Sequence, residues 1–230
     1  MLDNTIIIVT ADHGDYLGER SLWYKMGFFE HSARIPLILA GPGVTKGTAG
    51  NACSLLDMLP TMIDIARSTG APEPIYGRPV PGRSLMPLAR GEEDPVSEAI
   101  GEYCAEMTAS PVIMNRRNEY KFIYGETDPP LLFNLENDPD ELRNLAVETE
   151  FSGILADFTA EVESRWNSTE IQQRVIKSQK ERRAVHAAMG IGAITKWDYN
   201  PPRDASNEYV RNHMDWTVTA AKTRFPPFKK

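Results

Sequence analysis

The stretch TIIIVTADHG, residues 5–14, decides the fold of this 230-residue chain. It opens with a continuous run of β-branched side chains, a pattern typical of a strand buried on both faces, as in a parallel sheet. A second apolar run, IPLILA at residues 35–40, is closed by the turn residues Gly41, Pro42 and Gly43 and predicts a second strand. Together the two runs predict a parallel sheet within an α/β domain.

The residues that follow predict a helix, a loop and a second sheet. Apolar residues at helical spacing predict a helix over 54–68, and four prolines with two glycines predict a loop over 71–83. Two further helices are expected at 154–166 and 168–189, before a tail over 190–230 that contains proline and glycine. Four short patterns between turn residues predict antiparallel strands at 99–103, 112–115, 120–124 and 131–135.

Composition and charge exclude several classes of protein. The chain is 41% hydrophobic, yet no apolar run approaches the roughly 18 residues that cross a bilayer. No basic segment precedes an apolar stretch as in a signal peptide. The net charge of −7 argues against nucleic-acid binding, and the two cysteines, Cys53 and Cys104, show neither disulfide-framework nor metal-site spacing. We therefore expect a cytoplasmic protein with no membrane or nucleic-acid partner.

The charge is unevenly distributed along the chain. Residues 1–167 carry 13 Lys and Arg against 26 Asp and Glu, whereas residues 168–230 carry 12 against 6. A basic tail is often a solvated helix face. Opposite charges also favour docking of such a tail on its own body or on a neighbouring subunit. The second alternative predicts a homo-oligomer formed through the C-terminal tail.

Residues that suit anion and metal binding follow the first predicted strand. Asp12 and His13 come directly after it, at the edge where open α/β sheets bind ligands. A carboxylate is a hard oxygen donor for divalent cations, and an adjacent imidazole can complete such a site. Gly14 permits a sharp turn, and Lys25 is a point charge suited to a sulfate or phosphate ester. Taken alone, Asp12 and His13 also fit a structural role.

Six sequence features occur in a fixed order along residues 11–145: ADHG (11–14), LGE (17–19), Lys25, HSARIPLI (31–38), SLLDMLPT (54–61) and LFNLENDPDELRNL (132–145). Their order and spacing resemble the type I sulfatase family. The resemblance implies an alkaline-phosphatase-like α/β fold, of which this chain is expected to form the C-terminal part. Residues 1–95 would hold the remainder of the parallel sheet of the large domain. Residues 96–167 would form a small antiparallel α+β subdomain, and residues 168–230 a helix and an extended oligomerisation tail.

Within this family the chain is most similar to the choline-sulfatases, in GERSLWYKM (18–26), in FFEHSAR (28–34) and in its long tail. The resemblance implies a sulfuric ester hydrolase that converts choline O-sulfate and water to choline and sulfate. It also implies a bound Ca²⁺, with Mg²⁺ or Mn²⁺ as alternatives.

Site residues follow from the same resemblance. By position, Asp12 and His13 match metal ligands, and Lys25 matches a sulfate-binding lysine that acts with His13 in catalysis. A quaternary ammonium group is held by aromatic faces and carboxylates. Glu102 and Asp215 are therefore predicted to bind the choline end of the substrate.

One departure concerns the nucleophile. The family uses a formylglycine made from the cysteine of a Cys-x-Pro/Ala-x-Arg motif, but Cys53 precedes SLLD and Cys104 precedes AEMT. The formylglycine is therefore expected in an N-terminal half that this chain lacks, and the chain alone is expected to be inactive. Two alternatives stay open: a phosphodiesterase or phosphonate monoester hydrolase of the same superfamily, and a truncated, non-catalytic product.

Overall fold

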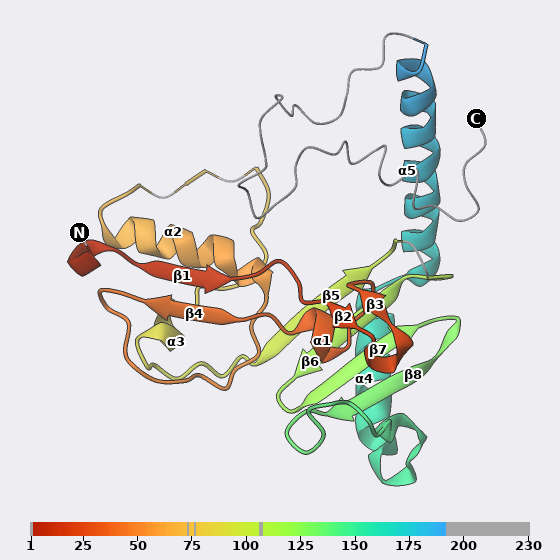
Figure 1. Cartoon of the computed structure of the whole chain (residues 1–230), viewed down its shortest axis with the longest axis horizontal. Coiled ribbons are helices and arrows are strands. Elements are labelled where there is room, and N and C mark those ends of the chain that lie inside the picture. The colour runs from red at the N-terminus through yellow and green to blue at the C-terminus, as the bar shows by residue number, and fades with distance from the viewer. Residues whose placement is uncertain (1, 73, 76, 106–107, 192–230) are drawn as a thin grey trace, which may run out of the picture. The chain divides into compact units, whose positions relative to one another are not determined.

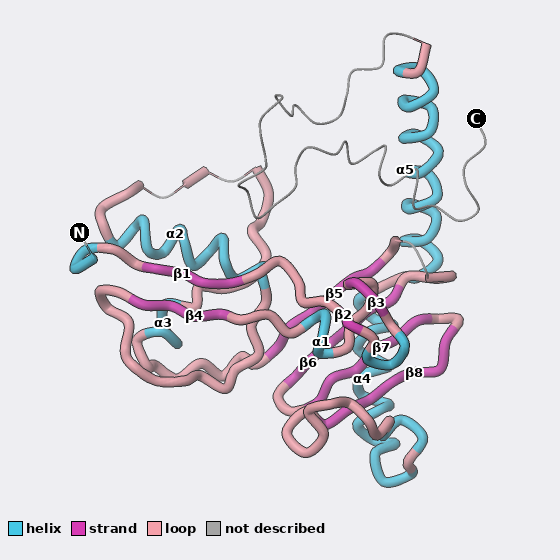
Figure 2. Tube along the Cα trace, in the orientation of Figure 1, coloured by secondary structure: helices cyan, strands magenta, loops and turns pink. Residues whose placement is uncertain are grey.

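The computed structural model describes residues 2–72, 74–75, 77–105 and 108–191 (Figure 1). The chain divides into two compact units, Met1–Ile176 and Lys177–Lys230. Figure 2 shows that the first unit contains both strands and helices, with the strands β5 to β8 following one another before α4. With 3-10 helices labelled η, the elements are η1 (Leu2–Asn4), β1 (Ile7–Thr10), β2 (Tyr16–Leu17), η2 (Glu19–Ser21), β3 (Trp23–Tyr24), α1 (Glu30–Ala33), β4 (Leu37–Ala40), η3 (Leu55–Asp57), α2 (Met58–Ser68), α3 (Met86–Ala89), β5 (Glu98–Tyr103), β6 (Val112–Arg117), β7 (Tyr120–Gly125), β8 (Asp128–Asn134), η4 (Leu145–Val147), η5 (Thr149–Phe151), α4 (Ser152–Arg165) and α5 (Ser168–Met189).

A four-stranded antiparallel sheet forms the best-packed part of the molecule. Its strands lie in the order β5-β6-β7-β8, so each strand pairs with its neighbour in the sequence. Asn115 of β6 lies opposite Ile100 of β5 on one side and Phe122 of β7 on the other. The predicted antiparallel sheet is therefore confirmed, with each predicted strand inside or within a residue of an observed one.

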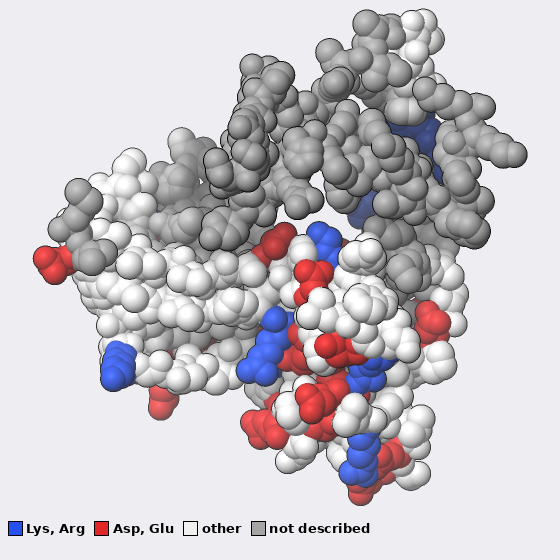
Figure 3. Space-filling view, viewed as in Figure 1, with Lys and Arg blue, Asp and Glu red and all other residues white. Residues whose placement is uncertain are grey.

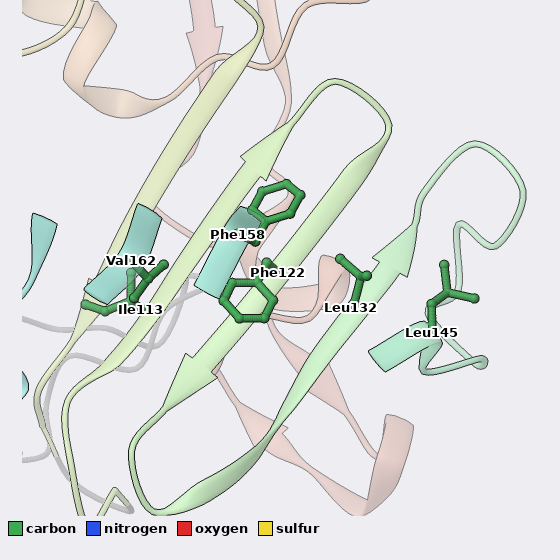
Figure 4. Close-up of a cluster of buried hydrophobic side chains, with 6 residues drawn as sticks. All are labelled: Ile113, Phe122, Leu132, Leu145, Phe158 and Val162. Atoms are coloured by element: carbon green, nitrogen blue, oxygen red, sulfur yellow. The ribbon is translucent and has the colours of Figure 1, made fainter. Parts of the chain in front are cut away.

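Each face of this sheet is covered by a different layer. Since side chains alternate along a strand, neighbouring residues contribute to opposite faces. On one face α4 packs over the strands, as Figure 4 shows for the cluster Ile113, Phe122, Leu132, Leu145, Phe158 and Val162. On the other face Met114, Ile123 and Phe133 contact Phe28 and Phe29, which directly precede α1.

The sheet predicted at the start of the chain differs from expectation in strand direction. β1 and β4 pair with each other antiparallel, with Ile8 opposite Leu39. Among the described residues neither strand pairs with a further strand. The strands predicted at residues 5–10 and 35–40 are therefore present, but the parallel sheet predicted from them is not formed by their pairing with each other. A continuous apolar run indicates that a strand can be buried on both faces, but it does not fix the direction of its neighbour.

The β1–β4 pair and α2 expose apolar side chains. Ile7, Val9 and Ile38 are 44–58% exposed, and Leu59 and Met62 of α2 are about half exposed. Figure 3 shows few charges over this part of the molecule, whereas acidic and basic side chains gather over the region of the four-stranded sheet. We call the exposed side chains of β1, β4 and α2 the apolar face.

The helix predicted over 54–68 is confirmed as η3 followed by α2. Ser54 and Asp57 form a capping box at its start, in which the Asp57 carboxylate accepts from the Ser54 backbone N–H at 2.9 Å. The same carboxylate accepts from the Arg83 N–H at 2.9 Å, and the Arg83 guanidinium pairs with Asp94 at 2.8 Å. These contacts tie the end of the predicted loop over 71–83 to the start of the helix.

The two C-terminal helices are also confirmed. α4 begins two residues before its predicted start, and α5 has the predicted bounds. Among the described residues, no helix combines the length and apolar character needed to cross a membrane. Residues 192–230, which hold most of the predicted tail, lie outside the described residues. The domain limits predicted at residues 95 and 167 stay predictions.

Phe158 tests the core between α4 and the sheet. Its side chain is 1% exposed, and its ring centroid lies 5.6 Å from that of Phe122. Phe158→Ala should lower the free energy of unfolding by about 3–5 kcal/mol, because it removes a buried ring and leaves a cavity. Val147→Ala, at a position 81% exposed, is the control and should change it by no more than about 0.5 kcal/mol. Urea unfolding followed by circular dichroism measures both, and equal losses would contradict this account.

Candidate functional site

The loop after β1 carries the first two predicted site residues, Asp12 and His13. Its course is fixed at Gly14, whose N–H donates to the Ser32 carbonyl oxygen at 2.8 Å. A side chain at Gly14 would overlap the backbone carbonyl of His31, so this close approach requires glycine. The approach places the loop beside α1.

The imidazole of His13 lies between Asp12 and Lys25. Its Nε2 is 2.8 Å from Lys25 Nζ and 3.3 Å from Asp12 Oδ2, and its Nδ1 is 2.7 Å from the Gly14 carbonyl oxygen. A carbonyl oxygen only accepts, so Nδ1 is assigned the proton of a neutral ring and donates it to Gly14. The Nε2 lone pair then accepts from the Lys25 ammonium group. A cation bound by His13 would have to displace the Lys25 ammonium group from this lone pair.

Lys25 follows a two-stranded hairpin formed by β2 and β3, in which Tyr16 lies opposite Tyr24. The Lys25 carbonyl oxygen accepts from the Ser32 hydroxyl at 2.7 Å and from the Gly27 N–H at 2.9 Å. The structure therefore brings Asp12, His13 and Lys25 together, although Lys25 is 12 residues from His13 in the sequence.

The three residues line one cleft of about 1910 Å³ within the first unit. Asp12 is exposed, with 82% of its side chain accessible, whereas His13 is 30% accessible. Arg34, Lys46 and Arg116 line the same cleft and add positive charge to that of Lys25. Glu30, Glu92, Glu93 and Asp94 line it as well, so the cleft carries charges of both signs and is open to solvent at Asp12.

Glu102 does not join this group. Its neighbours in β5, Gly101 and Tyr103, line the cleft, and a side chain at Gly101 would overlap the ring of Phe28. Because side chains alternate along a strand, Glu102 lies on the opposite face of the sheet. There its carboxylate accepts from Trp166 Nε1 at 2.6 Å. The structure therefore does not bring Glu102 together with Lys25, and its role at the choline end stays a prediction. Asp215, the other residue predicted for the choline end, lies outside the described residues.

Asp12 and His13 fit a cation only in part. They offer one exposed carboxylate and one imidazole lone pair, which are donors of the right type for a divalent ion. Among the described residues, however, no three His, Cys, Asp or Glu side chains lie close enough together to hold a metal ion. Since Ca²⁺ takes about 6–8 oxygen ligands, further donors would have to complete the site.

Neither cysteine has the character of a nucleophile. Both are free and partly buried. Burial raises the pKa of the Cys53 thiol, and burial likewise raises the pKa of the Cys104 thiol. A raised pKa lowers the fraction of thiolate, which is the reactive form.

Sequence reasoning missed the residue that holds both halves of the site. Ser32 is 3% exposed, and it bonds to the backbone of both Gly14 and Lys25. The available signal is its place within HSARIPLI (31–38), one of the motifs that carry the family resemblance. A small polar residue between two strands does not by itself reveal its partners.

Sequence comparisons place the chain among sulfatases. Residues 18–168 match the family model of the N-sulphoglucosamine sulphohydrolase C-terminal region, and residues 173–225 match that of the choline sulfatase enzyme C terminal. A choline-sulfatase from Rhizobium meliloti (strain 1021) is 40% identical over 98% of this chain and 44% of its own length. Human arylsulfatase K is 32% identical over 94% of this chain and 39% of its own length. The chain thus spans less than half the length of these relatives.

Solved structures show the same fold. A 2-O GAG sulfatase has a TM-score of 0.60 and 29% identity, covering 78% of this chain and 38% of its own. The phosphonate monoester hydrolase of Agrobacterium radiobacter has a TM-score of 0.58 and 23% identity, covering 70% of this chain and 35% of its own, and it supports the fold alone. The predicted α/β fold of the alkaline-phosphatase-like sulfatases is therefore confirmed. With residues 18–168 matched to a sulfatase family model, the chain belongs to the sulfatase family.

Proposed function

We propose that this chain forms the C-terminal part of a choline-sulfatase, a sulfuric ester hydrolase that converts choline O-sulfate and water to choline and sulfate. The observation that carries the proposal is the Lys25 ammonium group 2.8 Å from His13 Nε2, beside Asp12 in an open cleft. The 40% identity to a choline-sulfatase supports the choice of substrate. So does the match of residues 173–225 to a choline-sulfatase family model.

In this proposal Lys25 binds the sulfate group. Its ammonium group attracts the sulfate oxygens and stabilises the negative charge that grows on them in the transition state. Without an ion, the His13 Nε2 lone pair accepts from the Lys25 ammonium group, and an ion bound by His13 would take that lone pair in its place. Asp12 and His13 would provide two ligands to a Ca²⁺ ion, with Mg²⁺ or Mn²⁺ as alternatives. Such an ion would supply further positive charge opposite the sulfate.

The nucleophile would come from outside this chain. The chain covers 44% of the length of the choline-sulfatase relative, and neither of its cysteines fits the formylglycine motif. The remaining length of such a relative would supply the formylglycine and the other metal ligands. Lys25, His13 and Asp12 would then form one side of a composite active site.

The C-terminal tail would contribute to recognition of the choline group and to formation of a homo-oligomer. Asp215 lies within the region that matches the choline-sulfatase model, and a carboxylate attracts a quaternary ammonium group by charge alone. The basic tail and the acidic remainder favour a homo-oligomer in which the tail contacts a neighbouring subunit. We assign the whole protein to the cytoplasm within the same proposal.

The purified 230-residue chain should not hydrolyse choline O-sulfate. Lys25 and half a metal site can attract an anion, but they cannot supply the covalent nucleophile of the reaction. Choline release measured with a coupled oxidase assay should equal that of a control without protein. Release above this control would contradict the assignment of the nucleophile to another part of the enzyme.

A chimera tests the proposed activity directly. In it, this chain replaces the matching part of the Rhizobium meliloti choline-sulfatase, which restores a full sulfatase length. The chimera should hydrolyse choline O-sulfate faster than a phosphonate monoester or a phosphate diester assayed under the same conditions. A preference for the phosphorus substrates would instead favour a phosphonate monoester hydrolase or phosphodiesterase.

Two substitutions in the same chimera distinguish the role of Asp12 from that of Lys25. Asp12→Ala should lower the metal content measured by elemental analysis, because it removes a ligand oxygen. Lys25→Ala should retain the metal and lower kcat by about 10²–10³-fold, the usual loss for one charge-stabilising group. Asp15→Ala, which removes an exposed carboxylate three residues after Asp12, is the control. It should lower neither the metal content nor kcat. Unchanged metal content in Asp12→Ala would exclude it as a ligand.

Replacement of Asp215 should lower kcat/KM for choline O-sulfate more than kcat/KM for a neutral aryl sulfate. Asp215→Asn removes the charge that attracts the ammonium group, so kcat/KM for choline O-sulfate should fall roughly tenfold, equivalent to about 1.4 kcal/mol. The value for the aryl sulfate should change little. Asp204→Asn in the same tail is the matched control. Equal losses for both substrates would mean that Asp215 does not contact choline.

A further inference from the structure

A buried ion cluster lies beside the cleft. The Lys121 ammonium group is 2.8 Å from Glu30 Oε1 and 2.9 Å from Glu141 Oε1. The side chains of Lys121 and Glu141 are each 1% exposed, and that of Glu30 is 13% exposed. We call Lys121, Glu30 and Glu141 the ion cluster. Charges this deeply buried persist only with close partners of opposite sign, so the three groups hold each other in place.

The ion cluster joins three separate segments. Lys121 belongs to β7, Glu30 begins α1, and Glu141 lies in the turn after β8. The Glu141 carboxylate also accepts from the Glu30 backbone N–H at 2.7 Å. Because both the side chain and the backbone of Glu30 are bound, the first residue of α1 is fixed against the four-stranded sheet. This matters because α1 has only four residues and cannot hold its position by its own hydrogen bonds.

The turn that carries Glu141 is itself held to the site loop. The Arg20 guanidinium donates to the backbone carbonyl oxygen of Asp140 at 2.9 Å and to that of Glu141. It also lies over the ring of Phe29, 4.1 Å from the ring centroid. The hairpin that precedes Lys25 is thus tied to the same turn that binds α1.

Two residues after Glu30, Ser32 contacts both parts of the candidate site. Its carbonyl oxygen accepts from the N–H of Gly14, next to His13, and its hydroxyl donates to the carbonyl oxygen of Lys25. The two distances are 2.8 Å and 2.7 Å, and Ser32 is 3% exposed. One buried residue therefore holds the backbone on either side of the contact between His13 Nε2 and Lys25 Nζ.

We propose that Ser32 is a positioning residue that sets the separation of His13 and Lys25, and that the ion cluster fixes Ser32 by holding α1. The sheet then controls the geometry of the cleft through one short helix. The effect on turnover rests on the proposed function. The effect on the separation of His13 and Lys25 does not, and it can be measured in this chain alone.

The first experiment uses the 230-residue chain and nuclear magnetic resonance. Ser32→Ala removes the hydroxyl that binds Lys25 but keeps the carbonyl that binds Gly14. The nuclear Overhauser effect between the Lys25 side chain and the His13 ring should be lost, while the Gly14 amide stays protected from hydrogen exchange. Ser110→Ala is the matched control, since Ser110 is also buried and its hydroxyl lies 3.1 Å from the Thr127 hydroxyl, within the sheet region. Ser110→Ala should preserve the nuclear Overhauser effect between the Lys25 side chain and the His13 ring.

A second variant probes the ion cluster without removing a side chain from it. Glu30→Gln keeps the shape of the residue, and it leaves Lys121 paired with Glu141. The variant should fold, speed hydrogen exchange at Gly14 and weaken the contact between Lys25 and His13. If Glu30→Gln lowers the unfolding midpoint but leaves both signals as in the parent, the ion cluster is structural only.

The third experiment measures turnover of choline O-sulfate in the chimera. Ser32→Ala should lower kcat by roughly 10–100-fold with little change in KM or metal content, because a displacement of about 1 Å can cost up to about 10²-fold. Ser110→Ala should stay within twofold of the parent. A retained contact between Lys25 and His13 together with an unchanged kcat in Ser32→Ala would overturn the proposal. A parent chimera without activity would contradict the proposed function, and the resonance experiment would still decide the positioning role.

Discussion

The pairing of Lys121 with Glu30 and Glu141 is the interaction on which the rest of the first unit depends. Moving a charge from water into a protein interior costs several kcal/mol, and close partners must offset that cost. Loss of one partner leaves an unpaired buried charge, at a cost of about 3–5 kcal/mol. The cluster joins residues 91 positions apart in the chain, Glu30 and Lys121. The pairing therefore holds these two segments against each other.

The four-stranded sheet separates two environments. One face packs against α4 and is a conventional apolar core around Phe122 and Phe158. The other combines the apolar contact of Phe29 with Phe133 and the buried charges of Lys121 and its partners. Apolar packing is tolerant of small shifts, whereas ion pairs and short hydrogen bonds require defined distances. The face that needs geometric definition is thus the one that adjoins the cleft.

Much of this arrangement could be predicted from the sequence, and the limits have physical causes. The strands at Ile7–Thr10 and Leu37–Ala40 were predictable because apolar runs reflect burial, but their relative direction depends on partners that a local pattern does not contain. The proximity of Asp12, His13 and Lys25 could be expected from motif order. The face of the sheet on which Glu102 lies depends on the register of β5. The sequence pattern does not fix that register to within one residue, and a shift of one residue moves a side chain to the other face. Lys121 gave no signal, because its partners lie far away in the sequence.

The apolar face has a consequence for how this chain behaves in solution. β1 and β4 present Ile7, Val9 and Ile38 to solvent, and among the described residues each has a backbone edge with no strand beside it. An uncovered edge next to apolar side chains is a template for strand addition by any extended segment. Self-association of the isolated chain would therefore begin at β1 and β4 while the four-stranded sheet stays folded. Aggregation of the isolated chain would therefore depend on protein concentration. It would occur at temperatures well below the one at which that sheet unfolds.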